Sequence, residues 1–473
     1  MSTEGIDKQS PEVAEMAKNW PMISALVGGT AAMRAAGTAF MPKWPAEDQG
    51  SYDARIKTAT LFPAFSRTCS IMAAKPFAKA IGLDETKLPP QTKSYISDVD
   101  MYGTDLSPYL ASLFLGVMQS GLMGVLVDCP PANNVATLED EKKAGIRPYM
   151  ASYPASSILG WRSTRDAKGP HLTQLRLMEA VNEPDGEFGD KQIKQIRVLT
   201  PGAWKLYRES ETLGSSNGKK EWILHNEGTT SLKRIPFVFF YGVRTGFGSG
   251  FSPLLDLAFL NVEHWQSSSD QQTIVHVARI PVLFAKGFGE KDKITIGAST
   301  ACMASSVDAN LMYVEHSGAA VEAGRQSLLD LEERMRQTGA ELLVKRQRGS
   351  VATATEVRFE TEGNKSTLQK IVEDFEESAE ACLSLMAEWK GETFDGDIDM
   401  FKDFDAGGLA SINADLLLRA IENRVVSRET AFAEFKRLDV LSPDVQWDEE
   451  DKRIADDPPP PPDPGSKIKP ATE

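Results

Sequence analysis

Three basic residues at the end of a helical pattern are the part of this chain best suited to bind phosphate. Lys345, Arg346 and Arg348 close a long amphipathic stretch, and residues 349–355, which follow at once, are all small or β-branched. Lysine and arginine side chains bind phosphate oxygens without reading base sequence. The stretch therefore predicts a basic helix end and a short loop, in a chain whose net charge is −15. In an alternative interpretation, the three cations pair with Glu341 or with acidic residues of a neighbouring copy.

The usual sequence patterns of catalysis do not occur in this chain. There is no GxxxxGK[ST], no HExxH and no GxSxG. The GFGSGF stretch at residues 246–251 lacks GxGxxG spacing and favours a flexible hinge between a sheet and a long helix. His264 and the SSSD sequence at residues 267–270 fall inside an amphipathic helix, which favours packing and polar-face roles over a catalytic triad. We therefore expect a protein that is not an enzyme.

The cysteines and acidic clusters do not indicate a metal or cofactor site. The four cysteines (Cys69, Cys129, Cys302 and Cys382) include no CxxC pair, so we expect them to be buried or inert. The acidic run at residues 448–451 favours a solvated surface. No cofactor and no metal are expected.

The composition is typical of a soluble globular protein, with 41% apolar and 25% charged residues. The longest apolar runs, 121–128 and 235–243, have the length of strands rather than the roughly 18 residues of a membrane span. We expect a cytosolic protein without a membrane segment. Negative charge argues against a general nucleic-acid-binding protein, whose surface is basic, but not against one along which DNA slides.

Periodicity predicts an α+β fold with helices first and a sheet after them. Helical spacing covers residues 11–41, broken at Pro21 and Gly28-Gly29, and residues 52–81, broken at Pro63. A further helix over 106–121 is expected to start with Ser107 as cap and Pro108 at its first position, and a short buried strand follows it. Alternating runs from 147 to 243 predict an antiparallel sheet of about five to seven strands.

Three long helices dominate the second half of the predicted fold. The first opens at Ser252 and Pro253 and stops before Pro281, and a strand-rich insert follows it. The second runs over 319–345, and its apolar residues form a narrow stripe: Val321, Leu328, Leu331, Met335 and Leu342. Two helices of matching length around an insert predict an antiparallel stalk with a small head. Such a stalk has little core of its own and would be more stable packed against copies of itself.

The third long helix has clear start and stop signals. Ser366 and Gln369 form a capping box, and Gly391 occupies the position typical of a C-terminal glycine. Its apolar face comprises Leu368, Ile371, Val372, Phe375, Ala379, Cys382, Leu383 and Met386. Two or three short helices are expected between 412 and 441. The proline-rich end predicts a disordered or polyproline tail. In an alternative interpretation, this tail is a ligand for a proline-binding partner.

Several segments resemble tailed-bacteriophage portal proteins, the head-to-tail connectors. The resemblance is carried by the stretches SPLLDLAFLNVEHWQSSSDQQTIVHVARIPVLFAKGF, LMYVEHSGAAVEAGRQSLLDLEERMRQTGAELL and TATEVRFETEGNKSTLQKIVEDFEESAEACLSLMAEWKG, with YDARIKTATLFPAFSRT, GLMGVLVDCPP, RPYMASYPASSILGWR, IPFVFFYG and GGLASINADLLLRAIENRVVSRETAFAEFKRL in the same order along the chain. It extends over residues 52–457. It implies a ring, usually of twelve subunits, at one capsid vertex.

The resemblance also implies how the chain divides. A portal has a wing, a two-helix stem, a clip, a tunnel loop and a crown. These would be residues 1–250 and 366–399 for the wing, 251–279 and 319–345 for the stem, 280–318 for the clip, 346–365 for the tunnel loop and 400–457 for the crown, followed by the tail 458–473.

Partners and site residues follow from the same resemblance. Double-stranded viral DNA would be packaged by the large terminase through the ring, and would leave through it. The channel residues would be Lys345, Arg346, Arg348, Gly349, Ser350, Thr353 and Thr355. The clip residues facing terminase and head-tail adaptor or tail proteins would be Lys286, Phe288, Lys291 and Lys293. Major capsid and scaffold proteins are further expected partners of a virion protein assembled in the host cytoplasm. The alternatives are an oligomeric virion scaffold or adaptor without a channel, and a phage-encoded hydrolase.

Overall fold

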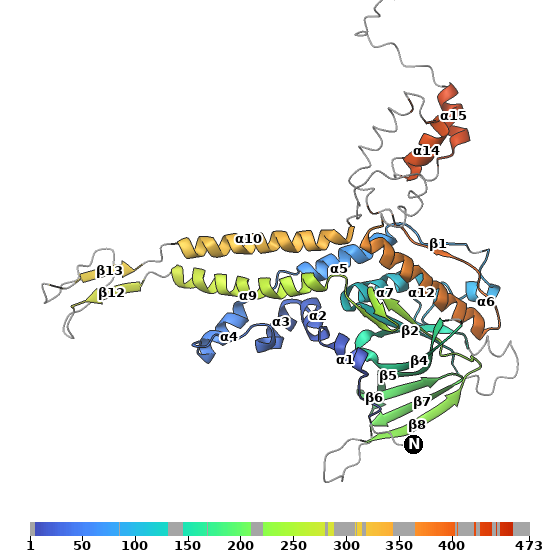
Figure 1. Ribbon diagram of the computed structural model, residues 1–473, viewed down its shortest axis with the longest axis horizontal. Helices are drawn as coiled ribbons and strands as arrows, with labels where there is room; N and C mark the ends of the chain where they lie inside the picture. The colour runs from blue at the N-terminus through green and yellow to red at the C-terminus, as the bar shows by residue number, and fades with distance from the viewer. Residues whose placement is uncertain are drawn as a thin grey trace, which may run out of the picture. The chain divides into compact units, whose positions relative to one another are not determined.

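The computed structural model (Figure 1) has an α+β fold of helices and antiparallel sheets. It describes residues 5–84, 86–130, 145–167, 169–209, 221–279, 282–287, 308, 310–314, 318–343, 365–402, 404, 421, 426–437, 441 and 445–456. They belong to two units, Met1–Lys402 and Asp403–Glu473. The α+β class predicted from periodicity is confirmed.

The first unit begins with a series of short helices: α1 (Pro11–Ala17), α2 (Trp20–Val27), α3 (Gly29–Ala36), η1 (Gly37–Ala39), α4 (Gln49–Thr58), α5 (Ala64–Ala74) and η2 (Lys75–Phe77). The break predicted at Pro21 is confirmed, because α1 ends at Ala17 and α2 begins at Trp20, one residue before the proline. Pro21 lies in the first turn of α2, where a missing N–H costs no hydrogen bond. The break at Gly29 is confirmed, because its φ of 73° leaves the helical region.

Helix α7 (Leu106–Ser120) is capped differently from the prediction. Asp105, not Ser107, is the N-cap, since its carboxylate accepts the Ser107 N–H at 3.1 Å. Pro108 therefore lies two positions further into the helix than expected. At the other end Gly121 adopts φ 80°, and a Cβ there would lie 2.0 Å from the Phe251 carbonyl carbon. Only glycine fits this helix end.

The predicted single sheet is two sheets. β2 (Leu122–Asp128) lies between β3 (Tyr149–Pro154) and β9 (Phe237–Tyr241). A separate five-stranded meander follows the chain order: β4 (Ile158–Asp166), β5 (Gly169–Asp185), β6 (Gly189–Thr200), β7 (Ala203–Glu209) and β8 (Trp222–Thr229). Alternation of apolar and polar residues identifies strands but not the strands with which they pair. Here the 3-10 turn η3 (Ala155–Ser157) separates β3 from β4, and the two strands join different sheets. The two sheets share one apolar core, which includes Leu126, Ile158, Leu175 and Phe237.

A buried polar cluster also joins the two sheets. The carboxylate of Glu179 on β5 accepts hydrogen bonds from Arg197 Nε at 2.6 Å and from the Tyr153 hydroxyl at 2.7 Å. Arg197 Nη1 also reaches Asp128 Oδ2 on β2 at 3.2 Å. Burial raises the pKa of Asp128, and the neighbouring guanidinium counteracts that shift. The cluster supplies partners for charges that would otherwise be costly to bury.

The GFGSGF stretch is an ordered hairpin, so the predicted hinge is wrong. β10 (Val243–Gly246) pairs with β11 (Ser249–Phe251). At the turn, Gly248 has φ 74° and donates its N–H to the Tyr241 hydroxyl at 2.9 Å. A Cβ at Gly248 would lie 2.6 Å from the Trp161 ring. The glycines therefore allow close packing of the turn.

Helix α12 (Thr367–Trp389) confirms its predicted ends and face. The Ser366–Gln369 capping box is present, Gly391 has φ 70°, and all eight predicted apolar residues are buried. Two α12 carboxylates hold the segment that follows: Glu376 accepts the Met400 N–H at 2.6 Å, and Glu380 accepts the Ile398 N–H at 2.8 Å. This segment includes β14 (Ile398–Asp399), which pairs with β1 (Gly82–Leu83); the short helix α6 (Pro90–Lys93) also packs on α12.

Two of the four cysteines are fully buried. Burial raises the pKa of the Cys69 thiol to about 12 and also raises that of Cys382, so both are protonated at neutral pH. Cys129 is half-buried, and Cys302 lies outside the described residues. The expectation of inert cysteines is confirmed for the buried pair.

The second unit contains α14 (Arg428–Arg437) and α15 (Trp447–Asp456). They meet through Phe432 and Trp447, whose ring centroids are 5.4 Å apart. α14 was predicted, but α15 was not. The sequence predicted only a solvated surface for the acidic residues of its first turn. Carboxylates at a helix N-terminus interact favourably with the helix dipole, so the same residues also stabilise a helix here.

Candidate functional site: the α9/α10 hairpin

The candidate site is built on two long helices and the strands between them. α9 (Leu255–Ala278) and α10 (Ala319–Ala340) run antiparallel and side by side, and β12 (Val282–Lys286) pairs with β13 (Asn310–Val314) next to their connected ends (Figure 1). α9 begins later than predicted because Ser252 and Pro253 form a turn, closed by the Leu255 N–H on the Ser252 carbonyl at 3.2 Å. α10 passes into the short turn η4 (Glu341–Leu343).

The seam between the two helices is narrow. Trp265 is fully buried on α9, and Leu331 and Met335 on α10 are each 2% exposed. Gly324 approaches α9 so closely that a Cβ would lie 2.0 Å from the Gln271 side-chain oxygen. The amide nitrogen of the same Gln271 donates to the Val321 carbonyl at 2.8 Å. The stripe predicted on the second helix is therefore one side of a real seam.

Polar groups also lie in this seam. His264 is 5% exposed, its Nε2 lies 3.4 Å from Glu332 Oε1, and its ring lies 5.2 Å from that of Phe62. This confirms a packing role for His264. Its Nδ1 and the Trp265 Nε1 are both buried without a hydrogen-bond partner among the described residues.

The exposed face of α10 carries charges that pair with one another. Arg325 bonds to Glu322 at 2.5 Å, and Arg336 bonds to Glu333 at 3.0 Å. Arg334 lies 3.5 Å from Glu263 across the seam on α9. These exposed pairs contribute little stability. Their consequence is electrostatic: each arginine of α10 already has a carboxylate partner, so the described part of the hairpin is not a basic surface.

Apolar side chains remain uncovered on the same hairpin. Phe259 and Ile274 on α9 are 53% and 37% exposed, and Leu329 on α10 is 41% exposed. Phe284 and Met312, on the paired strands β12 and β13, are each 48% exposed. Single exposed apolar residues are common, but a series along one hairpin indicates a surface for association.

A buried asparagine fixes α9 to the N-terminal helices. Asn261 is fully buried; its side-chain nitrogen donates to the Phe62 carbonyl at 2.8 Å, and its oxygen accepts the Phe65 N–H at 2.9 Å. These bonds supply partners for the Phe62 carbonyl and the Phe65 N–H, which flank the start of α5, where Pro63 interrupts the helical pattern. One side chain therefore sets how α5 meets the hairpin.

Arg55 links α4 to the same helix, next to a buried ion pair within the N-terminal segment. Arg55 bonds to Glu47 at 2.8 Å, with only 4% and 2% of the two side chains exposed, and lies 3.7 Å from Asp270 on α9. Its guanidinium lies 4.2 Å from the centre of the Trp44 ring. The hydrogen bond from Arg55 lowers the pKa of Glu47, while burial raises the pKa of Asp270. A groove of about 1000 Å³ runs between this cluster and the last turns of α9.

Most of the site residues predicted from the sequence lie outside the described residues. This holds for Lys345, Arg346, Arg348, Gly349, Ser350, Thr353 and Thr355, and for Phe288, Lys291 and Lys293. Lys286 is described: it is exposed on β12 and pairs with Asn310 in the strand register. Its role, like those of the others, stays a prediction.

Sequence reasoning missed the residues that hold the hairpin in place. Asn261 and Arg55 lie in helical patterns as ordinary polar residues. A signal existed for Arg55, since Trp44 and Glu47 precede it and offer a ring and a carboxylate. No local signal marks Asn261, because its partners lie about 200 residues earlier in the chain.

Searches for metal sites and membrane spans found no candidates among the described residues. No group of three or more histidine, cysteine, aspartate or glutamate side chains there could hold a metal ion. No described helix is both long and apolar enough to cross a bilayer.

Comparison with known proteins gives one family match and several similar structures. A family model described as a domain of unknown function, DUF4055, matches residues 253–390, which include the hairpin and α12. No curated protein matches the chain.

The similar structures are parts of a gene transfer agent (GTA) particle. A chain of the virion of the native particle is 12% identical, with a TM-score of 0.41 over 87% of this chain and 99% of that chain. Chains from the neck of the empty particle, computed with C6 symmetry, and of the native particle, computed with C12 symmetry, are 12% and 11% identical, each with a TM-score of 0.38. They cover 88% and 84% of this chain, and 100% and 96% of their own.

We predict that Arg55→Met destabilises the protein at neutral pH by about 2–3 kcal/mol, because Glu47 loses its charged hydrogen-bond donor. The native pair contributes stability above the unfolded pKa of Glu47, near 4.3, and loses it as pH falls through the lowered folded value. The difference between variant and wild type should therefore shrink below about pH 4. Urea denaturation at both pH values measures this, and Lys57→Ala, an exposed change on the same helix, is the control. An equal difference at both pH values would contradict the assignment.

Proposed function

We propose that this chain is a phage portal protein: a ring-forming subunit at the unique capsid vertex, through which terminase packages double-stranded DNA and to which head-tail adaptors dock. The observation that carries the proposal is the α9/α10 hairpin. It has the two antiparallel helices and intervening strands that the sequence resemblance implies for a stem and clip. In the single chain, its apolar side chains Phe259, Ile274 and Leu329 are exposed.

A ring supplies the missing cover for these side chains. Burying a large apolar side chain contributes about 1.5–3 kcal/mol, and a ring repeats that gain at each contact between neighbours. Phe259 and Leu329 lie on different helices of the hairpin. One copy can therefore present one helix to the preceding neighbour and the other helix to the next, an arrangement that closes into a ring when the rotation between copies is a whole fraction of a turn.

The charges of the hairpin suit a channel along which DNA slides. Arg325, Arg334 and Arg336 have carboxylate partners, so they offer little free positive charge to phosphates. Each phosphate that a protein neutralises releases counterions and strengthens binding. In the proposal, a stem of paired charges avoids tight binding, and the basic residues Lys345, Arg346 and Arg348 supply a local belt of contacts.

The remaining parts follow the implied order. β12 and β13 with the residues between them are the clip, where Lys286 faces terminase and adaptors. α12 belongs to the wing, and α14 and α15 belong to the crown. The proposed role is structural and not enzymatic, in the virion and in contact with capsid and scaffold proteins during assembly.

We predict that replacing Lys345, Arg346 and Arg348 together with alanine leaves assembly intact and lowers the amount of DNA packaged or retained in particles. Loss of the belt removes phosphate contacts without touching the seam of the hairpin. DNA per particle, measured from purified capsids, checks this. The control replaces three exposed lysines far from the hairpin in sequence, Lys18, Lys233 and Lys452. Equal DNA content in both triple variants would contradict the proposed phosphate contacts of the basic belt. It would not contradict the proposed ring assembly.

A further inference from the structure

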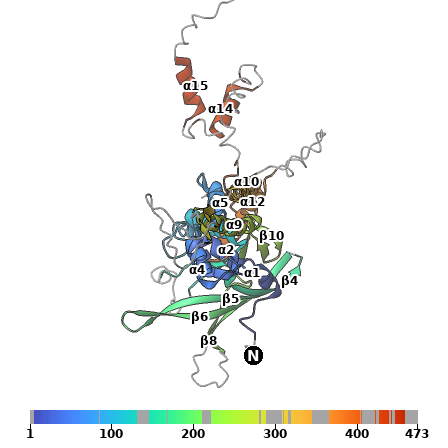
Figure 2. The same cartoon turned by 90° about the vertical axis from the view of Figure 1, so that its left-hand side faces the viewer.

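The tip of the β5–β6 hairpin carries the most exposed large apolar side chain of the described residues. Phe188 is 94% exposed, in the turn between Asp185 and Gly189, and Figure 2 shows this end of the hairpin standing away from the other elements. Gly186 adopts φ 77°, a conformation that suits glycine in the tight turn that carries Phe188. A fully exposed phenylalanine contributes nothing to the fold of its own chain.

Carboxylates flank Phe188 on the turn. The sequence EPDGEFGD, residues 183–190, contains four carboxylates, and Lys191, which follows it, lies opposite Glu183 in the strand register. Glu183 pairs with Arg208 at the base of the tip, at 2.8 Å. The tip therefore presents an aromatic ring between the carboxylates of Asp185 and Glu187, which suits an apolar cavity with a cation at its rim.

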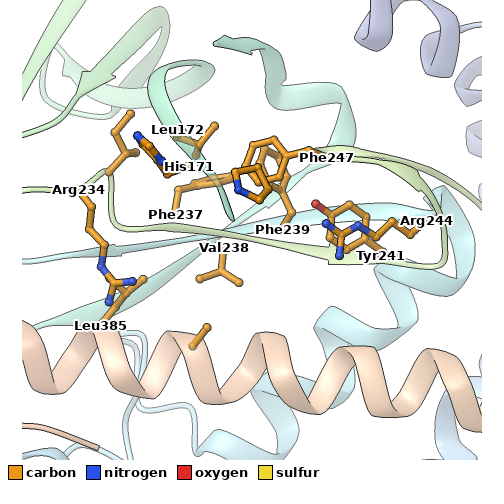
Figure 3. A pocket seen from close by; sticks show the side chains of 13 residues that line it. His171, Leu172, Arg234, Phe237, Val238, Phe239, Tyr241, Arg244, Phe247 and Leu385 are labelled. Carbon is orange, nitrogen blue, oxygen red and sulfur yellow. The ribbon is translucent and has the colours of Figure 1, made fainter. Parts of the chain in front are cut away.

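A cavity of that kind lies on the same molecule, at the edge of β9 (Figure 3). Its volume is about 310 Å³, and Figure 3 shows aromatic rings on one side of β9 and Val238 facing α12 on the other. The apolar lining comprises Phe237, Val238, Phe239, Tyr241, Phe247 and Leu385. An engineered apolar cavity of about 150 Å³ accepts benzene, so a phenyl group fits this one.

Two arginines lie at the rim of the cavity, one of them held by a carboxylate of α12. Arg234 and Arg244 are its charged lining residues, and none of the described lining residues is acidic. Arg234 binds Glu388 through Nε at 2.9 Å, while the Arg244 guanidinium lies 4.7 Å from the Tyr241 ring centre and is exposed. Within the described residues β9 pairs only with β2, so the cavity opens at an edge that another chain can reach.

The tip cannot enter the cavity of its own chain. His171, near the start of β5, lines the cavity, whereas Phe188 follows the other end of the same strand. A strand rises about 3.3 Å per residue, which separates the two by roughly 50 Å. The two complementary surfaces therefore lie at opposite ends of one rigid strand, and they can meet only between copies. Contacts between unlike surfaces are those that build rings.

We propose that Phe188 of one copy inserts into the β9–α12 cavity of its neighbour, with Asp185 and Glu187 facing Arg244. The contact rests on the proposed function, because it makes the wing a second ring contact besides the hairpin. It also gives the ring a direction, since each copy donates a tip to one neighbour and accepts a tip from the other.

The test replaces Phe188 by the photoreactive amino acid p-benzoylphenylalanine in the full-length protein. A mixture of ¹⁵N-labelled and unlabelled chains is irradiated, and cross-linked peptides are identified by mass spectrometry. We expect cross-links between labelled and unlabelled chains that join position 188 to residues 234–247 or 381–385. The control places the same amino acid at Tyr102, which is 91% exposed. A second variant, Ala381→Trp, fills the cavity and should lower the position-188 yield about tenfold, equivalent to 1.4 kcal/mol.

The outcomes separate this inference from the proposed function. Rings in which position 188 cross-links elsewhere, or not at all, overturn the wing contact and leave the portal proposal standing, with Phe188 free for a different virion protein. An unchanged yield in Ala381→Trp also overturns the contact. A chain that stays monomeric at every concentration overturns both.

Discussion

The narrow seam between α9 and α10 is the constraint on which the rest of the structure depends. Two helices that touch along one stripe can bury only that stripe, and the described buried apolar side chains of α10 are those of Leu331 and Met335. At Gly324 the helices approach so closely that a Cβ would lie 2.0 Å from the Gln271 side-chain oxygen. Phe259 and Leu329 stay outside the seam, and the described residues leave 53% and 41% of these two residues exposed.

Anchors at one end compensate for the small core of the hairpin. Asn261 fixes α5 to α9 through two backbone hydrogen bonds, and Arg55, held by Glu47 and Trp44, approaches Asp270 of α9 at 3.7 Å. Both are polar contacts with defined geometry, so they orient the helices more strictly than apolar packing does. In the proposed ring these contacts would align the copies, because a regular ring forms only if each copy holds its hairpin at the same angle.

Local signals predicted local structure well, and long-range contacts not at all. The capping box of Ser366 and Gln369 and the glycine at 391 involve residues within a few positions of one another, so the sequence marks them directly. Asp105 displaced Ser107 as a cap because both residue types cap helices and only the backbone decides. The division into two sheets and the role of Asn261 depend on partners far away in the chain, which periodicity does not specify. The basic residues predicted to touch DNA, among them Arg346, stay predictions.

Electron cryomicroscopy of the purified full-length protein, reconstructed without imposed symmetry, tests the central claim most directly. The account predicts a closed ring with a central opening wide enough for double-stranded DNA to pass. Phe259, Ile274 and Leu329 should be covered by neighbouring copies. A ring without an opening, or an assembly in which the hairpins stay exposed and unpaired, would contradict it.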